Sequence, residues 1–402
     1  MRTGVAEFQS ERLRQARQAR GLTQVALGKL IGRSSGTVSK WEKGDQAPES
    51  DALARLASQL ALPIAWFLKP LPDFGSRPAF NRSLAAATRE AQVGAAIRLQ
   101  WLNEVSLSLQ EWVDWPKVNV PEFGSGDYRQ HDDALIESAA LKCRDHWKLG
   151  LGPVSDVVLA MENAGVVFVR EELGYAKMDG SSRWFATDDR PYVLLASDKA
   201  NGIRNRFDAS HELAHLVLHR QLEGIDHIKR HAEIERQANH FAGAFLLPAE
   251  SFGAEVSRPS LDTFLALKPR WKVSIAAMIV RCSQLGIVDE SYATRLWKNY
   301  SARGWRRGEP LDEQYPFEPV RLLPRAVAML LSDGGFTPPR ILELLGLGPS
   351  DGESLCGLPE RFFSEDGSTP VLASIRFRRE GPRGAVPFSS KSADIVNFPG
   401  ER

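Results

Sequence analysis

Three residues in the middle of the chain have the types and spacing of a metal site. His211, Glu212 and His215 form an H-E-x-x-H motif. On a helix, residues four apart share a face, so both imidazoles can reach one ion from the same side. Glu212 can then reach a water bound to that ion. A catalytic zinc site also needs a third protein ligand and keeps a fourth position for water. Glu235, on a second expected helix, is the candidate third ligand, and Asn239 lies four residues beyond it.

Two amphipathic helices must position these side chains. The first carries Leu213, Leu216 and Val217 on a face of its own, and the second, which ends at Pro248, has an apolar face made of Ile234, Ala238, Phe241, Phe245 and Leu246.

An H-E-x-x-H match arises by chance in a chain of this size with a probability of roughly one in a hundred, and a helical histidine is more often a surface or core residue than a ligand. All 8 histidines lie between residues 131 and 240, however, so the metal interpretation is favoured.

The same stretch resembles the ImmA/IrrE-type metallopeptidases. The matching positions are Phe207, His211, Glu212, His215, His219, Glu235, Ala238, Asn239, Phe241, Ala242, Leu246, Leu247 and Pro248, and Ser210 stands where alanine is usual. The resemblance implies a zincin-like domain in which His211, His215 and Glu235 bind zinc. It also implies that Glu212 is the general base and that Asn239 orients a ligand histidine.

Other roles around this site stay open. His219 matches a histidine common in the family, and it either lies near the site or serves in packing or capping. The candidates for stabilising an oxyanion are Tyr192, His219 and Arg206. Manganese is an alternative to zinc, because two histidines and one carboxylate suit several divalent ions. A small sheet is expected beside the motif helix, and its edge strand would accept an extended substrate as an additional strand.

Residues 1–72 are expected to form a compact domain of five helices. The spacing predicts helices over 11–20, 24–31 and 35–43, a fourth that begins at Ser50, and a short fifth over 63–68. Thr23, Ser34 and Ser50 are suitable N-caps, and glycines follow the second and third helices. The segment resembles the XRE/Cro-type helix-turn-helix domain through L-T-Q at 22–24, V-S-K-W-E-K-G at 38–44 and the closing I-A-W-F-L.

This resemblance implies a DNA-binding domain. Residues 1–70 hold 11 Lys and Arg against 6 Asp and Glu, so a local charge of +5 lies in a chain whose net charge is only +1. Gln24 and Arg33 would contact phosphates, and the third helix would enter the major groove of a palindromic operator bound by a homodimer. The expected DNA-contacting residues are Gln24, Arg33, Ser35, Gly36, Thr37, Ser39, Lys40 and Lys43. Gly36 offers no side chain to a base, which predicts modest specificity. A protein-interaction domain of the same fold is the alternative.

The remaining segments complete an α+β fold that is mostly α. Residues 73–130 are expected to form a helical linker with one helix over 83–112, which is either a spacer, a dimer contact or a helix packed on the peptidase. The metallopeptidase domain is expected to span 131–288, with helices over 132–149, 153–163 and 261–285 and strands over 166–170, 182–186 and 192–195. A polar loop is expected at 224–230, and His227 within it and His231 just after it are expected to be solvated. Residues 289–402 form a C-terminal, mainly helical region of unknown role, with helices over 291–301, 320–332 and 338–347 and an extended run over 370–377.

Length and composition limit the classes of protein to which the chain can belong. A chain of 402 residues suggests two or three domains, and its fractions of hydrophobic (43%) and charged (25%) residues are ordinary for a globular protein. The three cysteines, Cys143, Cys282 and Cys356, are far apart, which argues for reduced thiols and a cytoplasmic protein. We expect no signal peptide and no membrane partner, since the N-terminus is charged and no apolar run could span a bilayer.

Two hypotheses about function follow. In the first, the chain is a DNA-binding regulator with a zinc endopeptidase domain that cleaves itself, a partner regulator or a toxin in a stress, phage or toxin-antitoxin response. In the second, it is a non-proteolytic repressor or antitoxin whose metallopeptidase fold serves as a sensor or a partner-binding platform. The intact motif favours the first hypothesis, and the covalent link to a DNA-binding domain keeps the second open.

Overall fold

A four-stranded sheet separates the two largest hydrophobic cores of the residues that the structure describes. The computed structural model describes residues 4–81, 89–123, 127–174, 178–199, 201–222 and 230–364. The strands are β1 (Phe80–Asn81), β2 (Val167–Glu171), β3 (Gly180–Phe185) and β4 (Arg190–Ala196), in the order β1-β3-β4-β2. β2 runs parallel to β4, while β3 is antiparallel to both β4 and β1. Three of these strands were expected, with shifted ends, whereas β1 was not.

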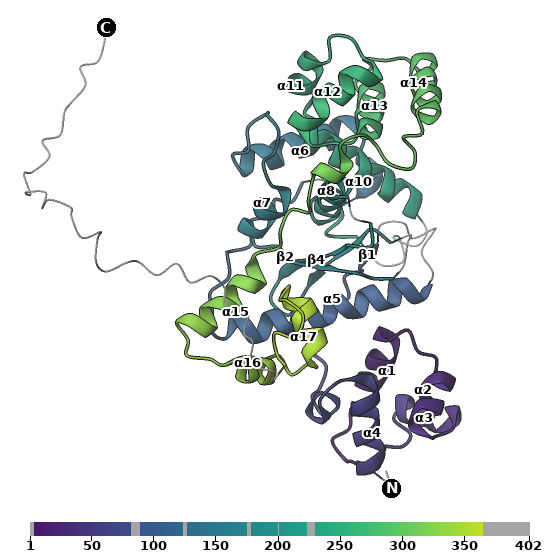
Figure 1. Ribbon diagram of the computed structural model, residues 1–402, viewed down its shortest axis with the longest axis vertical. Helices are drawn as coiled ribbons and strands as arrows, with labels where there is room; N and C mark the ends of the chain where they lie inside the picture. Colours follow the sequence, from purple (N-terminus) through teal and green to yellow (C-terminus); the bar gives the residue numbers. More distant parts are fainter. Residues whose placement is uncertain are drawn as a thin grey trace, which may run out of the picture. The chain divides into compact units, whose positions relative to one another are not determined.

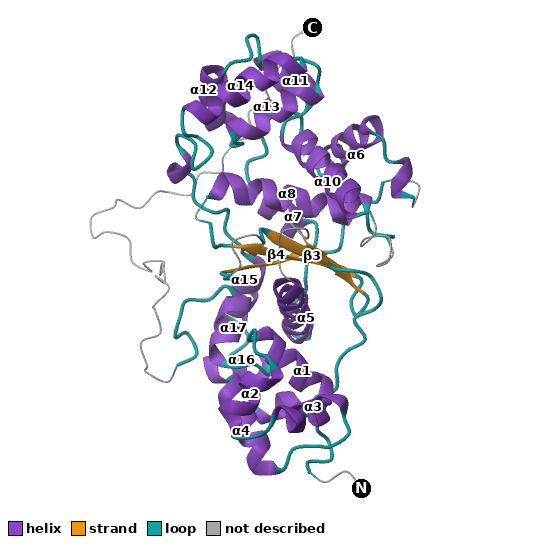
Figure 2. Ribbon diagram, turned by 90° about the vertical axis from the view of Figure 1, so that its right-hand side faces the viewer, coloured by secondary structure: helices purple, strands orange, loops and turns teal. Residues whose placement is uncertain are grey.

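The first core lies between one face of the sheet and the helices of the metallopeptidase-like region. Val193 and Leu195 of β4 and Trp184 of β3 point into it. The helices on this side are α6 (Asp133–His146), α7 (Val157–Asn163), α8 (Gly202–Leu218), α10 (His231–Leu246), α11 (Ala249–Glu255), α12 (Leu261–Trp271), α13 (Ile275–Gln284) and α14 (Glu290–Ala302). Figure 1 and Figure 2 show α8 and α10 on this face of the sheet.

The second core covers the opposite face and continues into the N-terminal helices. Strand residues that alternate with those of the first core, such as Tyr192 and Leu194, point into it. α5 (Arg89–Gln110) crosses this face of the sheet, as Figure 2 shows. The same core contains side chains from α1 (Ser10–Ala19), α2 (Gln24–Ile31), α3 (Ser35–Lys43), α4 (Ser50–Leu60), the 3-10 helix η1 (Ile64–Phe67), α15 (Leu322–Ser332), α16 (Pro338–Leu345) and α17 (Pro349–Cys356).

Two arginines, one buried and one half-buried, fasten the N-terminal helices to the rest of the chain. Arg12 of α1 is fully buried, and its guanidinium binds both carboxylate oxygens of Glu104 on α5 at 2.7 Å. Arg20, near the end of α1, pairs with Asp351 of α17 at 2.5 Å. Asp351 also accepts a hydrogen bond of 2.6 Å from Arg98 of α5. Residues 4–364 accordingly belong to one compact unit, and the domain boundaries after residues 72, 130 and 288 stay predictions.

The mostly helical α+β class is confirmed, with local differences from the expected elements. The single helix expected over 261–285 is two helices, because Lys272 adopts a left-handed conformation (φ 52°) and Ser274 caps α13. The expected cap Ser50 is the first residue of α4, and Glu49 occupies the N-cap position. The helix expected over 83–112 is α5, while His227 and the run 370–377 lie outside the described residues. Among the described helices, none is long and apolar enough to cross a membrane.

Candidate metal centre

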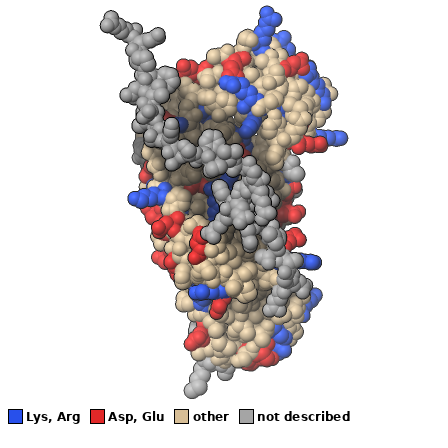
Figure 3. Space-filling view, turned by 60° about the vertical axis from the view of Figure 1, so that its left-hand side comes forward, with Lys and Arg blue, Asp and Glu red and all other residues tan. Residues whose placement is uncertain are grey.

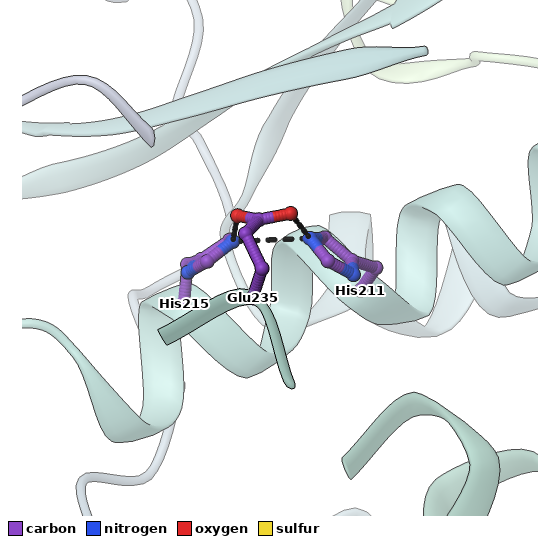
Figure 4. A group of neighbouring side chains, drawn as sticks. All are labelled: His211, His215 and Glu235. Atoms are coloured by element: carbon purple, nitrogen blue, oxygen red, sulfur yellow. Dashed lines mark hydrogen bonds and ion pairs between the residues drawn. The ribbon is translucent and has the colours of Figure 1, made fainter. Parts of the chain in front are cut away.

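α8 and α10 bring His211, His215 and Glu235 together. The Nε2 atoms of the two histidines lie 3.1 Å apart. Glu235 Oε2 is 3.4 Å from His211 Nε2, and Glu235 Oε1 is 3.3 Å from His215 Nε2. Figure 4 shows the carboxylate facing both imidazoles across the gap between the helices. Among the described residues, these three form the group of side chains that could hold a metal ion.

The spacing fits a small tetrahedral ion. Bonds of about 2.0 to 2.1 Å at tetrahedral angles place ligand atoms about 3.3 Å apart. The three distances of 3.1, 3.3 and 3.4 Å lie close to that value. Burial by itself raises the pKa of Glu235, but the two imidazoles that face its carboxylate, those of His211 and His215, hold this pKa well below its usual range. The site therefore presents a carboxylate, the form that binds metal.

Asn239 fixes the orientation of the first histidine. Its Nδ2 donates to the backbone oxygen of Glu235 at 2.8 Å, so its Oδ1 is the acceptor that faces His211 Nδ1 at 3.1 Å. His211 consequently carries its proton on Nδ1 and presents an unprotonated Nε2 to Glu235. The family resemblance implied a contact of this kind for Asn239, and its role at a bound metal stays a prediction.

A longer relay of hydrogen bonds fixes the second histidine. Gln237 donates from Nε2 to the carbonyl of Tyr128 at 2.8 Å, and a carbonyl can only accept. Its Oε1 must therefore accept from His219 Nε2 at 2.8 Å. His219 Nδ1 is then the acceptor for His215 Nδ1–H at 3.0 Å, which leaves His215 Nε2 unprotonated. Burial, followed by the neighbouring His215, lowers the pKa of His219 well below its usual value, so His219 stays neutral.

Gln237 is the functional candidate that the sequence analysis did not identify. Its side chain is fully buried on α10, two residues after Glu235 and two before Asn239. A buried glutamine in the middle of an amphipathic helix was the available signal, because such a side chain needs hydrogen-bond partners. His219 lies beside the site, where it contacts His215, and it also occupies the C-cap position of α8.

Glu212 is buried next to the metal-binding group and is held by β3. Its Oε2 accepts a hydrogen bond of 2.5 Å from Ser182 Oγ. β3 approaches so closely that a Cβ on Gly180 would lie 3.0 Å from Glu212 Oε1. A larger residue at position 180 would press on this carboxylate, so glycine there keeps the space that Glu212 occupies.

Three expectations around the site were wrong. His231 is not solvated: it begins α10 with a side chain only 15% exposed, and its Nδ1 lies 3.9 Å from Glu235 Oε1. Tyr192 cannot stabilise an oxyanion at this site, since it points into the second core and donates to Asp188. Arg206 is also engaged elsewhere, because it pairs with Glu318 and binds the backbone oxygen of Val154.

The segment that follows α14 fastens the first turn of α8. Gly202 donates its backbone N–H to the carbonyl of Tyr315, and a Cβ at position 202 would lie 2.2 Å from the carbonyl oxygen of Pro316. Glu318, which pairs with Arg206 of α8, also accepts from the backbone N–H groups of Val157 and Val158 in α7. This segment therefore sets the position of the helix that carries the two histidines.

The N-terminal helices place the expected DNA-contacting residues on an accessible face. Thr23 and Ser34 cap α2 and α3, and Gly32 and Gly44 end these helices in the left-handed conformation. Val38 and Trp41 bury one face of α3. The residues on its other face are Ser35, Gly36, Lys40 and Lys43, which are exposed, and Thr37 and Ser39, which are half-buried.

Much of the positive charge counted in the sequence is not on this face. Arg12 and Arg20 pair with Glu104 and Asp351, as described above, and Arg17 pairs with Glu42 at 2.5 Å. Gln24 also donates to Glu42, at 2.8 Å. Arg33 lies 3.4 Å from Glu49. Basic and acidic side chains are interspersed on the face of the molecule in Figure 3. On α3 itself the basic residues are Lys40 and Lys43, and both are exposed.

The fold and the two sites define a helix-turn-helix protein joined to a metallopeptidase-like domain. Comparison with protein families agrees with this description. Residues 13–67 match the helix-turn-helix family, and residues 161–283 match the IrrE N-terminal-like domain. The chain therefore carries an XRE-type helix-turn-helix domain and an IrrE/ImmA-like peptidase domain, and it is a DNA-binding regulator with a metallopeptidase-like part. No curated protein matches the chain.

Proposed function

We propose that this regulator is also a zinc-dependent endopeptidase. The observation that carries the proposal is the convergence of His211, His215 and Glu235 at tetrahedral spacing, with Glu212 beside them. His211, His215 and Glu235 would hold the ion. When bound, zinc polarises a peptide carbonyl and makes a bound water acidic near neutral pH.

The other residues have assigned tasks in peptide hydrolysis. Glu212 accepts a proton from the attacking water and passes it to the nitrogen of the leaving amine. Ser182 holds Glu212 in place through the hydrogen bond to Oε2. Asn239 and His219 keep the Nε2 atoms of the ligand histidines unprotonated, since each engages the Nδ1 of one ring.

We further propose that α3 reads an operator in the major groove. Lys40 and Lys43 contact phosphates or base edges, while Ser35, Gly36, Thr37 and Ser39 lie along the groove. Gln24 and Arg33 flank this face, and each exchanges an intramolecular partner for a phosphate on binding. A homodimer on a palindrome follows from the two-fold symmetry of such operators, and sedimentation of the DNA complex would test it.

Metal analysis of the purified chain tests the peptidase proposal. We expect about one zinc ion per wild-type chain and little in Glu235→Ala, because two histidines alone do not close the site. Glu233→Ala is the matched control, since Glu233 lies on the same helix and pairs with Arg230 instead. Manganese in place of zinc would change the identity of the ion and leave the site assignment intact. A metal-free wild type after incubation with zinc would refute the proposal.

The role of Glu212 needs a separate variant. Glu212→Gln keeps the hydrogen bond with Ser182 but removes the proton acceptor. We therefore expect the variant chain to bind zinc and operator DNA as the wild type does, and to cleave no protein substrate. Proteolysis that persists in this variant would contradict the assignment of the general base.

A second function is supported by the ion pairs that fasten α1. Because Arg12 and Arg20 connect the DNA-binding helices to α5 and α17, ligand binding in the peptidase-like region has a direct route to the operator-binding face. A regulator that senses through this fold without proteolysis would keep these contacts and lack zinc. The metal analysis separates the two functions.

A further inference from the structure

The edge of β3 that faces away from β4 is covered by a segment from a distant part of the sequence. We call residues 74–81 the strap. At one end of β3, the carbonyl of Phe74 accepts from the backbone N–H of Ala186 at 3.4 Å. At the other end, Phe80 pairs antiparallel with Ser182 as part of β1. The strap thus follows β3 along its length, although it lies about a hundred residues away in the chain.

Side chains hold the strap against the strand. Arg183 donates to the carbonyl of Gly75 at 2.8 Å, and Ser181 donates to the carbonyl of Phe80 at 2.7 Å. Arg77 lies 3.2 Å from Asp189. Gly75 has a φ of 75°, and a Cβ there would come within 2.7 Å of a neighbouring side-chain carbon, so glycine permits this close approach.

The strap ends directly over the candidate metal centre. The ring of Phe80 stacks on the imidazole of His215, with centroids 4.6 Å apart and an interplanar angle of 7°. Phe80 is only 5% exposed and packs in a small cluster with Tyr128, Leu222 and Ile234. Its partner in the sheet, Ser182, is the residue that holds Glu212. The strap therefore reaches the site in two ways. Its backbone pairs with Ser182, which holds Glu212, and the ring of Phe80 packs on His215.

An uncovered sheet edge beside a metal centre is a binding surface for an extended peptide. The unpaired N–H and C=O groups of such an edge bind a peptide as an additional strand, and pockets for alternate side chains give specificity. We infer that the strap occupies the peptide-binding edge of this metal centre, and that the ligand of the edge is an extended peptide with an aromatic side chain against His215. The inference rests on the proposed function, because it assigns the ligand of the same site.

The strap is covalently connected to the chain that it binds, so it competes effectively with an external peptide for the edge of β3. A tethered segment competes at an effective concentration on the order of millimolar, so an external peptide must displace it. The strap follows η1 after only a few residues, and Arg12 of α1 donates to the carbonyls of Lys69 and Pro70 at 2.9 and 3.0 Å. Pro70, Pro72 and Pro78 disfavour a helix in this stretch, which keeps it extended.

Binding of the strap sequence in trans tests the inference. The probe is a fluorescein-labelled synthetic peptide with the sequence PDFGSRPAFN of residues 72–81. The full-length chain is used free of metal, so the result does not depend on zinc. We expect the Phe80→Ala chain to bind the peptide at least tenfold more tightly than the wild type, because the tethered competitor has lost its aromatic contact. A peptide that carries the same Phe80→Ala change should bind the variant at least tenfold more weakly than the unchanged peptide.

The control and a second measurement keep the outcomes distinct. Phe336→Ala removes a phenylalanine that is similarly buried, at 6% exposure, within the second core, and it should bind the peptide as the wild type does. Hydrogen exchange at the amide of Ala186 should be at least tenfold faster in Phe80→Ala and should slow again when the peptide is added. Equal peptide affinities of wild type and Phe80→Ala, or unchanged exchange at Ala186, would overturn the inference. Absence of zinc from the wild type would instead refute the proposed function and leave these binding results interpretable.

Discussion

Gln237 offers a test of whether hydrogen bonds outside the metal-binding group control metal affinity. Gln237→Met keeps the length and approximate volume of the buried side chain but can neither accept a hydrogen bond from His219 nor donate one to Tyr128. Without that acceptor, His219 is free to place its proton on Nδ1, and His215 then loses the partner that keeps its own proton on Nδ1. The Nε2 atom of His215 would be protonated in part of the population and unable to bind metal.

The magnitude follows from the number of interactions lost. Removal of a hydrogen-bond partner of a metal-binding histidine costs roughly 10- to 100-fold in metal affinity, which is about 1.4 to 2.8 kcal/mol. The buried contacts of Gln237 with His219 and Tyr128 are also lost, although the carbonyl of Tyr128 keeps the backbone N–H of His131 at 3.1 Å. The metal-free chain should therefore lose about 1 to 3 kcal/mol of unfolding free energy. Gln237→Glu still accepts from His219 and should retain more metal affinity than Gln237→Met, although its carboxylate faces the carbonyl of Tyr128.

Competition with a chromophoric chelator measures the zinc dissociation constant, and urea denaturation of the metal-free chain measures stability. Gln221→Met is the control, since Gln221 is exposed and bonds only to Glu122 among the described residues. A zinc affinity of Gln237→Met within about twofold of the wild type would refute the relay, because a contact that sets the protonated nitrogen of a ligand must change its affinity.

Three further perturbations have defined outcomes. Glu104→Ala leaves the guanidinium of Arg12 buried without its carboxylate and should cost about 3 to 5 kcal/mol in urea denaturation, whereas a loss below about 1 kcal/mol would argue against this buried pair. Burial by itself raises the pKa of Glu137, but hydrogen bonds from Arg281 and His240 lower it from 4.5 to about 2. A lowered folded-state pKa stabilises the protein above pH 4.5, and this stabilisation is lost as the pH falls towards 2. Glu137→Gln should therefore remove a contribution on the order of 3 kcal/mol to the unfolding free energy. The unfolding free energy of the metal-free variant should then depend less on pH between 4.5 and 2. Lys40→Ala should weaken binding to DNA and lower the salt dependence by about 0.9 for a lost phosphate contact, while Lys298→Ala on α14 should change neither; equal slopes would remove Lys40 from the interface.

The local parts of both sites were readable from the sequence. The spacing of His211 and His215 places them on one face of any helix, and the apolar positions of both site helices proved to be buried, as expected. Asn239 follows Glu235 by one helical turn, so their common direction is also a local property. The caps Thr23 and Ser34 and the glycines after α2 and α3 likewise act within a few residues of themselves.

The tertiary structure decided what depends on contacts between distant residues. β1 consists of two residues in a proline-rich segment, and no alternating pattern can mark so short a strand, so its pairing with β3 appears only when residues 80 and 182 meet. The use of Arg12 and Arg20 in ion pairs depends on partners on α5 and α17, which a count of charges cannot reveal. The partners of Gln237 lie on two other segments for the same reason. Sequence periodicity specifies which face of an element is buried, whereas the partner of that face is chosen by the packing of the whole chain.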